Sequence, residues 1–370
     1  MGGPVDNPAM DWDVYCRVVD NHGDLGVCWR LSADLGARGQ RVRLWIDDAS
    51  ALAWMAPQGA PGVSVHRWPD AHATAAPGQV VIAAFGCQLP DGVLAAMAAA
   101  RPAPVWVNLE YLSAEDYVER SHGLPSLQSA GPAAGLTQWF FYPGLTDTTG
   151  GLLHEPGLAA RRAAFDRTAW LTSKGIERRQ REAIVSLFCY APQPAFGALL
   201  HALEAQGDGD STLLLAAPGA ATDLLREHLG PALARGRLRG VALPWLAQPD
   251  YDHLLWASDL NIVRGEDSWV RAQWAGLPFV WQVYPQHDGA HRAKLDAFLD
   301  RYLAEAPAAV ASALRAASLR WNGWGDAPLV LPPMGAWRTQ AVRWRDGLAS
   351  RPDLTTQLIG FVHRHTTASR

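Results

Sequence analysis

The chain alternates strand-like apolar runs with stretches of helical spacing, and this alternation limits the possible folds more than any other feature. The first unit consists of the run "WDVYCRVV" at residues 12–19, a helical stretch "GVCWRLSADLGARG" that ends on Gly39, and a second run "RVRLWID". Strands that alternate with helices along a sequence pair in parallel, with the helices on the faces of the sheet. The sequence therefore predicts an α/β fold built on parallel sheets.

The alternation occurs as two series in tandem. In the first series, residues 63–68, 79–85 and 105–109 are further strand-like runs. The second series contains the runs "EAIVSLFCY", "STLLLAA", "RLRGVALPWL", "SDLNIVRG" and "PFVWQVYPQ". Because a chain of 370 residues exceeds what one hydrophobic core usually supports, we expect two Rossmann-like domains that face each other.

The expected domain boundaries follow from these series. We expect a disordered or extended N-terminus at residues 1–11, a first domain at 12–178 and a second domain at 179–345. Residues 346–370 are expected to form a C-terminal helix that packs back on the first domain. The stretch 126–151 is rich in Pro, Gly and Ser, which predicts connecting loops there.

Composition excludes several classes of protein. The formal net charge is -4 and the pI is near 6.3, and the sequence shows no stripe of basic residues. This argues against a protein whose main function is to bind nucleic acid. The amino end lacks the basic and apolar regions of a signal peptide, and no run reaches the roughly 18 apolar residues of a membrane span. Four scattered cysteines without a C-x-x-C pair are typical of buried free thiols. We therefore expect a cytoplasmic protein that contacts no membrane.

The turn after the first strand, "VDNHGDLGV", holds more acidic and glycine residues than a turn requires. In open α/β sheets, ligands bind beyond the carboxyl ends of the strands, near helix N-termini. A dinucleotide fold needs G-x-G-x-x-G here, but only Gly23 and Gly26 are present, with Asp24 between them. A carboxylate repels a pyrophosphate, so this turn is better suited to holding a base or a cationic acceptor.

A second unusual turn lies in "NIVRGEDSWVRAQWAG", where the chain leaves a strand and enters a helix. The backbone amides of Glu266, Asp267 and Ser268 would point at an anion. Ser268 would add a hydroxyl, and Arg264 or Arg271 a positive charge. This turn predicts a diphosphate site.

Purely structural explanations remain open for the same residues. Asp20 and Asn21 are residue types that form an Asx turn, and Asp24 is a typical helix N-cap. Glu266 and Asp267 are typical acids of a first helical turn. The presence of two such loops, one in each predicted domain, favours the functional explanation.

Four stretches together carry a resemblance to a known family: "DNHGDLGVCWRLSADL", "WIDD", "NLEYLSAED" and "RGEDSWVRAQWAGLPFVWQVYPQ". They closely resemble the EarP family of bacterial protein-arginine rhamnosyltransferases, over about Trp12 to His291. The resemblance implies an inverting glycosyltransferase of the GT-B type, with two facing Rossmann-like domains, an interdomain cleft and C-terminal helices. In this arrangement the first domain binds the acceptor and the second binds the nucleotide sugar.

The resemblance further implies the reaction. Such an enzyme transfers L-rhamnose from dTDP-β-L-rhamnose to one arginine of elongation factor P, recognised through the N-terminal domain of that factor. The modification activates the factor for the rescue of ribosomes stalled at polyproline. Neither a cofactor nor a metal is implied.

Individual roles also follow from the resemblance. Asp24 matches the general base, with Asp20 as its companion acid and Glu266 as a further catalytic residue. His22 stands where the family usually carries Phe or Tyr, which puts the packing of the acceptor at that position in question. The residues implied to bind substrate are Asn21, Gly23, Glu110, Phe188, Tyr190, Gln248, Tyr251, Arg264, Gly265, Asp267, Ser268 and Tyr284.

Three rival functions remain. A nicotinamide-dependent dehydrogenase would explain two Rossmann-like halves and an acid at Asp47 or Asp48, but the glycine pattern is missing. A noncatalytic sugar-binding protein would usually carry an export signal. Another GT-B glycosyltransferase with a different acceptor, such as a lipid or small molecule, is the closest rival.

Overall fold

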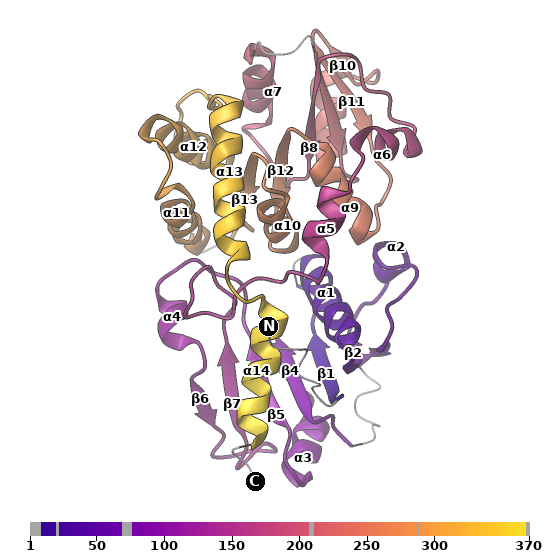
Figure 1. Ribbon diagram of the computed structural model, residues 1–370, viewed down its shortest axis with the longest axis vertical. Coiled ribbons are helices and arrows are strands. Elements are labelled where there is room, and N and C mark those ends of the chain that lie inside the picture. Colours follow the sequence, from indigo (N-terminus) through magenta and orange to yellow (C-terminus); the bar gives the residue numbers. More distant parts are fainter. Residues whose placement is uncertain (1–8, 20–21, 69–75, 207–210, 287–288, 368–370) are drawn as a thin grey trace. The chain divides into compact units, whose positions relative to one another are not determined.

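The computed structural model describes residues 9–19, 22–68, 76–206, 211–286 and 289–367, and the chain divides into two compact units (Figure 1). Unit 1 comprises Met1–Pro156 and Arg351–Arg370, and unit 2 comprises Gly157–Ser350. The division therefore falls after Pro156 rather than after residue 178 as expected. The reason is that Trp170 and Ile176 pack in one hydrophobic cluster with Ile184 of unit 2.

Unit 1 is built on a sheet that has seven strands among the described residues. Their order is β3 (Val63–Arg67), β2 (Arg41–Ile46), β1 (Asp11–Cys16), β4 (Val80–Ala84), β5 (Val105–Leu109), β7 (Thr137–Phe141) and β6 (Pro125–Leu127). The neighbours from β3 to β7 pair in parallel, and β6 pairs antiparallel with β7. The parallel α/β prediction is confirmed for this unit.

The strands β6 and β7 correct one expectation. Residues 126–151 were expected to form connecting loops, but Thr137–Phe141 is a parallel strand beside β5. The sequence conceals this strand because only its last residue, Phe141, is fully buried. Without a buried alternate face, the period-2 pattern of a strand is absent.

Helices surround this sheet and complete its core. They are α1 (Gly23–Ala37), α2 (Leu52–Met55), α3 (Asp91–Ala99), α4 (Tyr117–Ser121) and α14 (Leu354–Thr367). Although α14 comes from the carboxyl end of the chain, Leu354, Leu358 and Phe361 lie in the same buried cluster as Leu25 of α1. The core of unit 1 is therefore closed by the last helix of the sequence.

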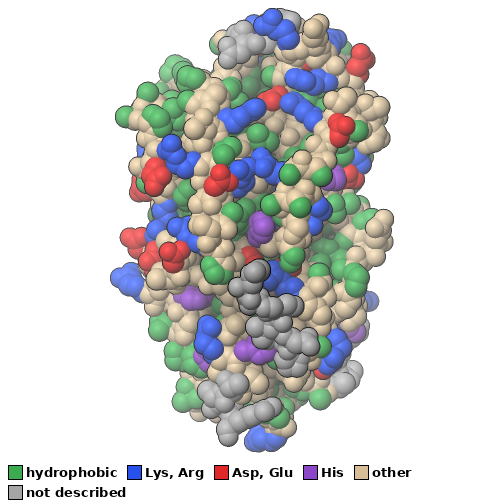
Figure 2. Space-filling model, viewed as in Figure 1, with side chains coloured by type: hydrophobic (Ala, Val, Ile, Leu, Met, Phe, Trp, Pro, Cys, Tyr) green, Lys and Arg blue, Asp and Glu red, His purple; other side chains and the backbone are tan. Residues whose placement is uncertain are grey.

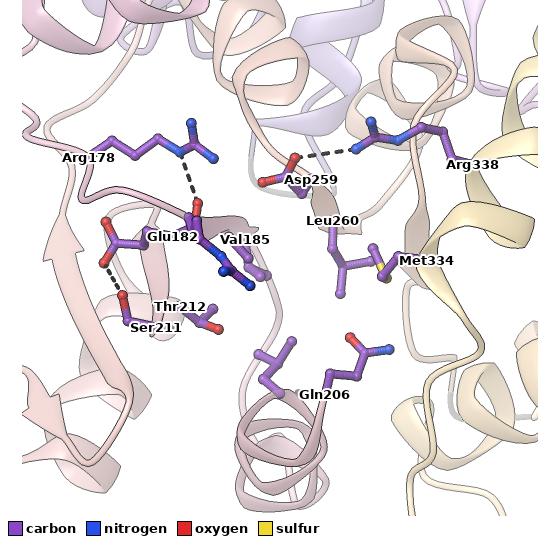
Figure 3. Close-up of a pocket in the computed structure, with 13 residues that line it drawn as sticks. Arg178, Glu182, Val185, Gln206, Ser211, Thr212, Asp259, Leu260, Met334 and Arg338 are labelled. Atoms are coloured by element: carbon purple, nitrogen blue, oxygen red, sulfur yellow. Dashed lines mark hydrogen bonds and ion pairs between the residues drawn. The ribbon is translucent and has the colours of Figure 1, made fainter. Parts of the chain in front are cut away.

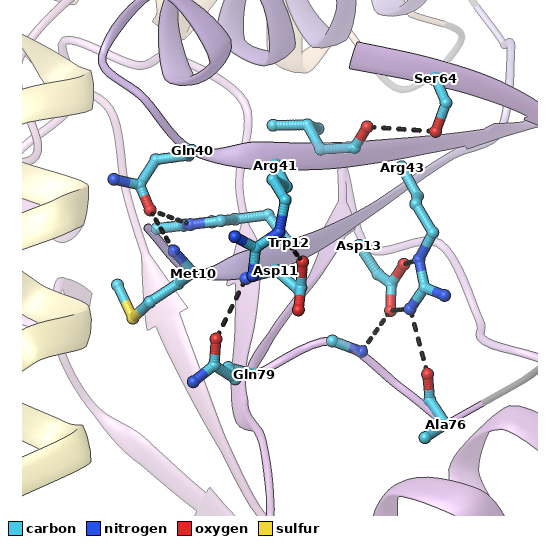
Figure 4. Close-up of polar contacts among 12 residues, drawn as sticks. Met10, Asp11, Trp12, Asp13, Gln40, Arg41, Arg43, Ser64, Ala76 and Gln79 are labelled. Carbon is cyan, nitrogen blue, oxygen red and sulfur yellow. Dashed lines mark hydrogen bonds and ion pairs between the residues drawn. The ribbon is translucent and has the colours of Figure 1, made fainter. Parts of the chain in front are cut away.

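A buried carboxylate fixes the register at the amino end of this sheet (Figure 4). Asp13 of β1 accepts hydrogen bonds from Arg43 of β2 at 2.6 and 2.7 Å and from the Trp45 indole at 2.9 Å. The Gly78 N–H donates to the same side chain at 2.7 Å. A Cβ at Gly78 would approach the Asp11 carbonyl oxygen to 2.6 Å, so the close approach of this turn requires glycine.

Unit 2 contains a second sheet, with six strands among the described residues. Their order is β10 (Ala234–Arg235), β11 (Leu238–Ala242), β9 (Ser211–Ala216), β8 (Glu182–Leu187), β12 (Leu260–Arg264) and β13 (Phe279–Gln282). The pairs from β11 to β13 are parallel, and only the short β10 pairs antiparallel in this described set. These strands correspond to the second predicted series.

The helices of unit 2 cover this sheet. They are α5 (Leu158–Ala163), α6 (Arg167–Ser173), α7 (Phe196–Ala205), α8 (Ala220–Leu229), α9 (Gln248–Ala257), α10 (Asp267–Ala275), α11 (Ala290–Leu303), α12 (Ala308–Trp321) and α13 (Met334–Ala349). No helix in the described ranges is long and apolar enough to cross a membrane. The four cysteines are free, as expected, and Cys87 alone among them is only partly buried.

Candidate active site

In unit 1, the predicted acidic turn follows β1 and leads into α1. Asp24 lies in the first turn of α1 and is 2% exposed. Its Oδ2 accepts a hydrogen bond from the Val19 N–H at 2.8 Å, and its Oδ1 accepts one from the Tyr111 hydroxyl at 3.2 Å. His22 occupies the N-cap position, so the alternative that Asp24 is the N-cap is wrong. The carboxylate is instead held in one orientation from two sides.

Tyr111 was missed by the sequence analysis and belongs to this cluster. It follows β5, and its ring stacks on Phe85 at 4.3 Å between centroids and 13° between planes. Phe85 follows β4 and has a φ of 58°, an uncommon backbone conformation for a bulky residue. The signal in the sequence was the position of both aromatic residues within two residues of the end of a parallel strand.

Glu110 stands at the same edge of the sheet. Its carboxylate accepts a hydrogen bond from the Asn108 side chain at 2.6 Å, and its backbone N–H bonds to the Phe141 carbonyl. Burial, followed by the negative charge of Glu110, raises the pKa of Tyr142 to about 12. The structure thus brings Asp24 and Glu110 to the carboxyl edge of one sheet, with aromatic side chains around them.

The remaining residues of the acidic turn lie partly outside the description. Asp20 and Asn21 are not among the described residues. Gly23 begins α1, and the ring of His22 meets the Trp54 ring edge-to-face at 5.3 Å. His22 therefore makes an aromatic contact within unit 1, as a Phe or Tyr at this position could.

In unit 2, an arginine and several aromatic rings gather at the carboxyl ends of β8 and β12. The Arg264 guanidinium carbon lies 4.3 Å from the ring centre of Phe188 and 4.3 Å from that of Tyr190. Tyr284 meets Tyr190 edge-to-face at 5.5 Å, and Tyr251 meets Phe188 at 5.8 Å. Two predicted residues, Phe188 and Tyr190, thus contact the predicted cation, Arg264, and two more, Tyr251 and Tyr284, pack against their rings.

The turn between β12 and α10 has a defined backbone. Gly265 has a φ of 61°, in the left-handed region that favours glycine. The Trp281 indole donates to the Gly265 carbonyl at 2.8 Å, and Trp281 itself stacks on Trp269 at 3.7 Å. The Ser268 hydroxyl accepts from the Arg264 N–H at 3.1 Å and donates to the Arg264 carbonyl. The Ser268 side chain therefore stabilises the turn through its two hydrogen bonds to the Arg264 backbone.

Glu266 and Asp267 lie at the N-terminus of α10. Glu266 is the N-cap residue, and its side chain makes no capping hydrogen bond there. Asp267 is the first residue of the helix, and both side chains are partly exposed. The N–H groups at the start of this helix make it a favourable location for an anion.

Two further predicted residues come from α9. Gln248 begins this helix and is buried, and Tyr251 follows in its first turn. Burial raises the pKa of the Tyr251 hydroxyl, which keeps this phenol neutral. Arg271, one of two cations considered for the anion, instead forms a buried pair with Asp252 at 2.7 Å. The positive charge of this site therefore comes from Arg264.

No group of three or more His, Cys, Asp or Glu residues in the described part of the chain could hold a metal ion. The carboxylates at the two carboxyl edges are arranged to accept hydrogen bonds and to hold a cation or a sugar hydroxyl. Each unit thus carries one predicted half of a substrate site at the edge that open α/β folds use for ligands.

Comparison with known proteins identifies the family. A model of the elongation factor P (EF-P) rhamnosyltransferase EarP matches residues 12–363. Protein-arginine rhamnosyltransferases of Pseudomonas aeruginosa and of Neisseria meningitidis serogroup B are 43% and 33% identical to this chain. The alignments cover 95% and 97% of this chain and 98% of each relative.

A solved structure gives the same result. It describes the structural basis for EarP-mediated arginine glycosylation of translation elongation factor EF-P, and it superposes with a TM-score of 0.65 at 31% identity. The likeness covers 96% of this chain and 99% of the other. The predicted fold class, α/β of the GT-B type, is confirmed. The family match includes both the Asp24 turn and the Arg264 turn, and the chain belongs to the EarP family of rhamnosyltransferases.

Proposed function

We propose that this protein transfers L-rhamnose from dTDP-β-L-rhamnose to an arginine side chain of EF-P, with inversion at the anomeric carbon. The observation that carries the proposal is the match of the EarP family model across residues 12–363. The proposed acceptor works in translation, so the reaction would take place in the cytoplasm. We also propose that this protein contacts the N-terminal domain of EF-P.

The carboxylates of unit 1 suit an arginine acceptor. A guanidinium stays protonated at neutral pH and its nitrogen lone pairs are delocalised, so it is a poor nucleophile. Asp24 would align one nitrogen and take its proton as attack proceeds, with Asp20 and Glu110 holding the positive charge on the other nitrogens. The two hydrogen bonds to Asp24 support this role, because they fix the direction of its oxygens.

The residues of unit 2 suit the donor. Arg264 and the N–H groups at the start of α10 would stabilise the departing diphosphate. Phe188 and Tyr190, whose rings pack against Arg264, and Tyr251 would provide aromatic surface for the thymidine. Glu266 and Asp267 would accept hydrogen bonds from the rhamnose hydroxyls.

The proposed step balances as a simple displacement. A bond forms between the anomeric carbon and a guanidine nitrogen, while the bond from that carbon to the β-phosphate oxygen breaks. The nitrogen loses one proton to Asp24, and dTDP leaves with the bonding electrons. Attack from the face opposite the nucleotide gives α-rhamnosyl-arginine.

The test is the intact mass of EF-P after incubation with this protein and dTDP-β-L-rhamnose. We expect a gain of one deoxyhexose, mapped by peptide fragmentation to a single arginine. The same incubation with EF-P in which that arginine is replaced by lysine should give no gain. If the donor binds but EF-P gains no mass, the acceptor is wrong and a GT-B transferase with another acceptor becomes the better proposal.

A further inference from the structure

A cavity of about 340 Å³ lies at the amino edge of the sheet in unit 2. Its walls include the first residues of three strands: Glu182 of β8, Ser211 of β9 and Leu260 of β12. Met334 and Arg338 of α13 complete it from the other side. A volume of this size suits a small ligand.

This cavity is separate from the candidate donor site. Arg264 ends β12, whereas Leu260 begins the same strand. Phe188 directly follows β8, whose first residue is Glu182. The six residues of β8, at a rise of about 3.3 Å each, put roughly 17 Å between the two edges. A small ligand in the cavity therefore cannot contact the residues at the carboxyl edge.

Arginines that do not line the cavity already neutralise its two carboxylates. Both carboxylate oxygens of Glu182 accept hydrogen bonds from the Arg239 guanidinium at 2.7 Å. Both carboxylate oxygens of Asp259 accept hydrogen bonds from the Arg167 guanidinium, at 3.1 and 2.8 Å. Burial favours the neutral form of both acids, but the hydrogen bonds from these arginines prevail, and the pKa of each carboxyl is lowered. Both acids are therefore ionised and paired.

Arg178, Arg181 and Arg338 line the cavity and bring positive charge beyond that of the two arginines that pair with its acids. The Arg178 Nε–H donates a hydrogen bond to the Glu182 carbonyl oxygen at 2.9 Å. Arg338 donates one hydrogen bond, at 3.3 Å, to Asp259, which is already paired with Arg167. Arg181 has no hydrogen-bond or ion-pair partner within the described ranges, and it has a φ of 55°, which is strained for an arginine. On the face that α13 crosses, Lys and Arg side chains gather over unit 2 (Figure 2).

The arginines and the apolar side chains occupy different parts of the cavity. Arg178 and Arg338 lie on one side with Asp259 between them, and Gln206 lies across from them (Figure 3). Leu260 and Met334 contribute apolar surface between these two sides. Guanidinium groups bind phosphate oxygens through paired N–H donors, and an apolar wall binds the rest of an organic molecule.

We propose that this cavity binds a small organic phosphate, with its phosphate on Arg178, Arg181 and Arg338 and its apolar part against Leu260 and Met334. The occupant would join α13 to the first residues of β8 and β9. The site is distinct from the proposed donor site and does not depend on the proposed reaction.

The test is calorimetric titration of the full-length protein with phenyl phosphate at constant ionic strength. We expect saturable binding to the wild type and a loss of affinity of about tenfold or more in the double variant Arg181→Gln/Arg338→Gln, because two charged hydrogen-bond donors are removed. Binding should also raise the melting temperature of the wild type but not of the double variant. Inorganic phosphate should bind more weakly than phenyl phosphate, since it lacks the apolar part.

Two control variants make the outcome specific. Arg226→Gln removes one exposed arginine of unit 2 that does not line the cavity, and Arg264→Gln removes the cation of the donor site. Arg226→Gln should keep the wild-type affinity, and Arg264→Gln should keep the binding event that the double variant Arg181→Gln/Arg338→Gln loses, even where phenyl phosphate also binds at the donor site. The proposal is overturned if phenyl phosphate does not bind, if the double variant binds as tightly as the wild type, or if Arg264→Gln alone abolishes binding.

Discussion

Asp24 is a buried carboxylate whose two oxygens are each held by a donor of unit 1. Asparagine keeps its shape but cannot take a proton. Asp24→Asn should therefore lower the turnover of EF-P rhamnosylation by about 10²-fold or more and leave the affinity for dTDP unchanged. Single-turnover rates and calorimetry with dTDP measure these effects. Asp147→Asn, at a residue whose side chain is 81% exposed, is the matched control, and equal activity of both variants would remove Asp24 from the base role.

In the proposed reaction, Tyr111 would act through Asp24, as a positioning residue. Tyr111→Phe keeps the ring on Phe85 but removes the hydroxyl that donates to Asp24. Because a hydrogen bond to a charged group contributes about 1.5–3 kcal/mol, kcat should fall roughly tenfold or more. The KM for the nucleotide sugar should not change. A rise in that KM with an unchanged kcat would contradict this role.

The stability of unit 1 should depend on pH through His122. Burial lowers its pKa below the ordinary value of 6.5, and its Nδ1 accepts the Tyr142 N–H at 3.1 Å, so the folded form is neutral. Below about pH 6.5 the unfolded chain binds a proton that the folded chain does not bind, so the free energy of unfolding falls as the pH falls. Urea denaturation at pH 7 and pH 5 should show a smaller loss for His122→Gln, whose amide oxygen can accept the same N–H. An equal loss in both proteins would show that His122 is not responsible.

The sequence points to single candidate residues, but it does not show which other side chains they contact in the folded protein. Asp24 and Arg264 could be proposed as site residues because each stands in an unusual turn at the end of a strand. Tyr111 could not be assigned, since it is 87 residues from Asp24 in sequence and meets it only after β5 has formed. The pairing of Arg271 with Asp252 was equally hidden, because it depends on the packing of α9 against α10.

At the scale of elements, the turn between β12 and α10 depends on Gly265. Alanine at its φ of 61° should lower the free energy of unfolding by about 1–2 kcal/mol, and it should weaken dTDP binding by moving the N-terminus of α10. Gly335→Ala is the matched control, since that glycine lies in α13 and a Cβ added there would have open space around it. It should leave dTDP binding unchanged and stabilise the helix slightly. Thermal unfolding and calorimetry measure both variants, and equal effects would exclude a special role for this turn.

Strands were predictable where nearly all their residues are buried, because the sequence then shows a continuous apolar run. The buried strands β1, β4 and β8 read directly as apolar runs. The strand β7 did not, because four of its five residues are only partly buried and its neighbours are Pro, Gly and Ser. The boundary between the units also lies earlier in the sequence than predicted. The reason is that α5 and α6 belong to unit 2 although they precede its first strand.

At the scale of the whole molecule, unit 1 is discontinuous in sequence and unit 2 is continuous. A fragment of residues 157–350 should fold alone, whereas residues 1–156 should not, because they lack α14 and expose the surface that Leu358 and Phe361 cover. Joining residues 1–156 to 351–370 with a short Gly/Ser linker should restore folding, since the Leu354 N–H bonds to the Leu152 carbonyl at 2.9 Å. Circular dichroism melts and NMR spectra test all three. A cooperative melt of residues 1–156 alone would contradict this dependence on α14.

The position of α14 also bears on the order of events during synthesis. The ribosome makes the first part of unit 1 before unit 2, but α14, the helix that completes the core of unit 1, is made only after all of unit 2. Unit 2 is complete before that helix is made, so the half of the protein that begins later can finish folding earlier. A prematurely terminated chain would keep an open apolar surface on unit 1, which is what chaperones and proteases recognise.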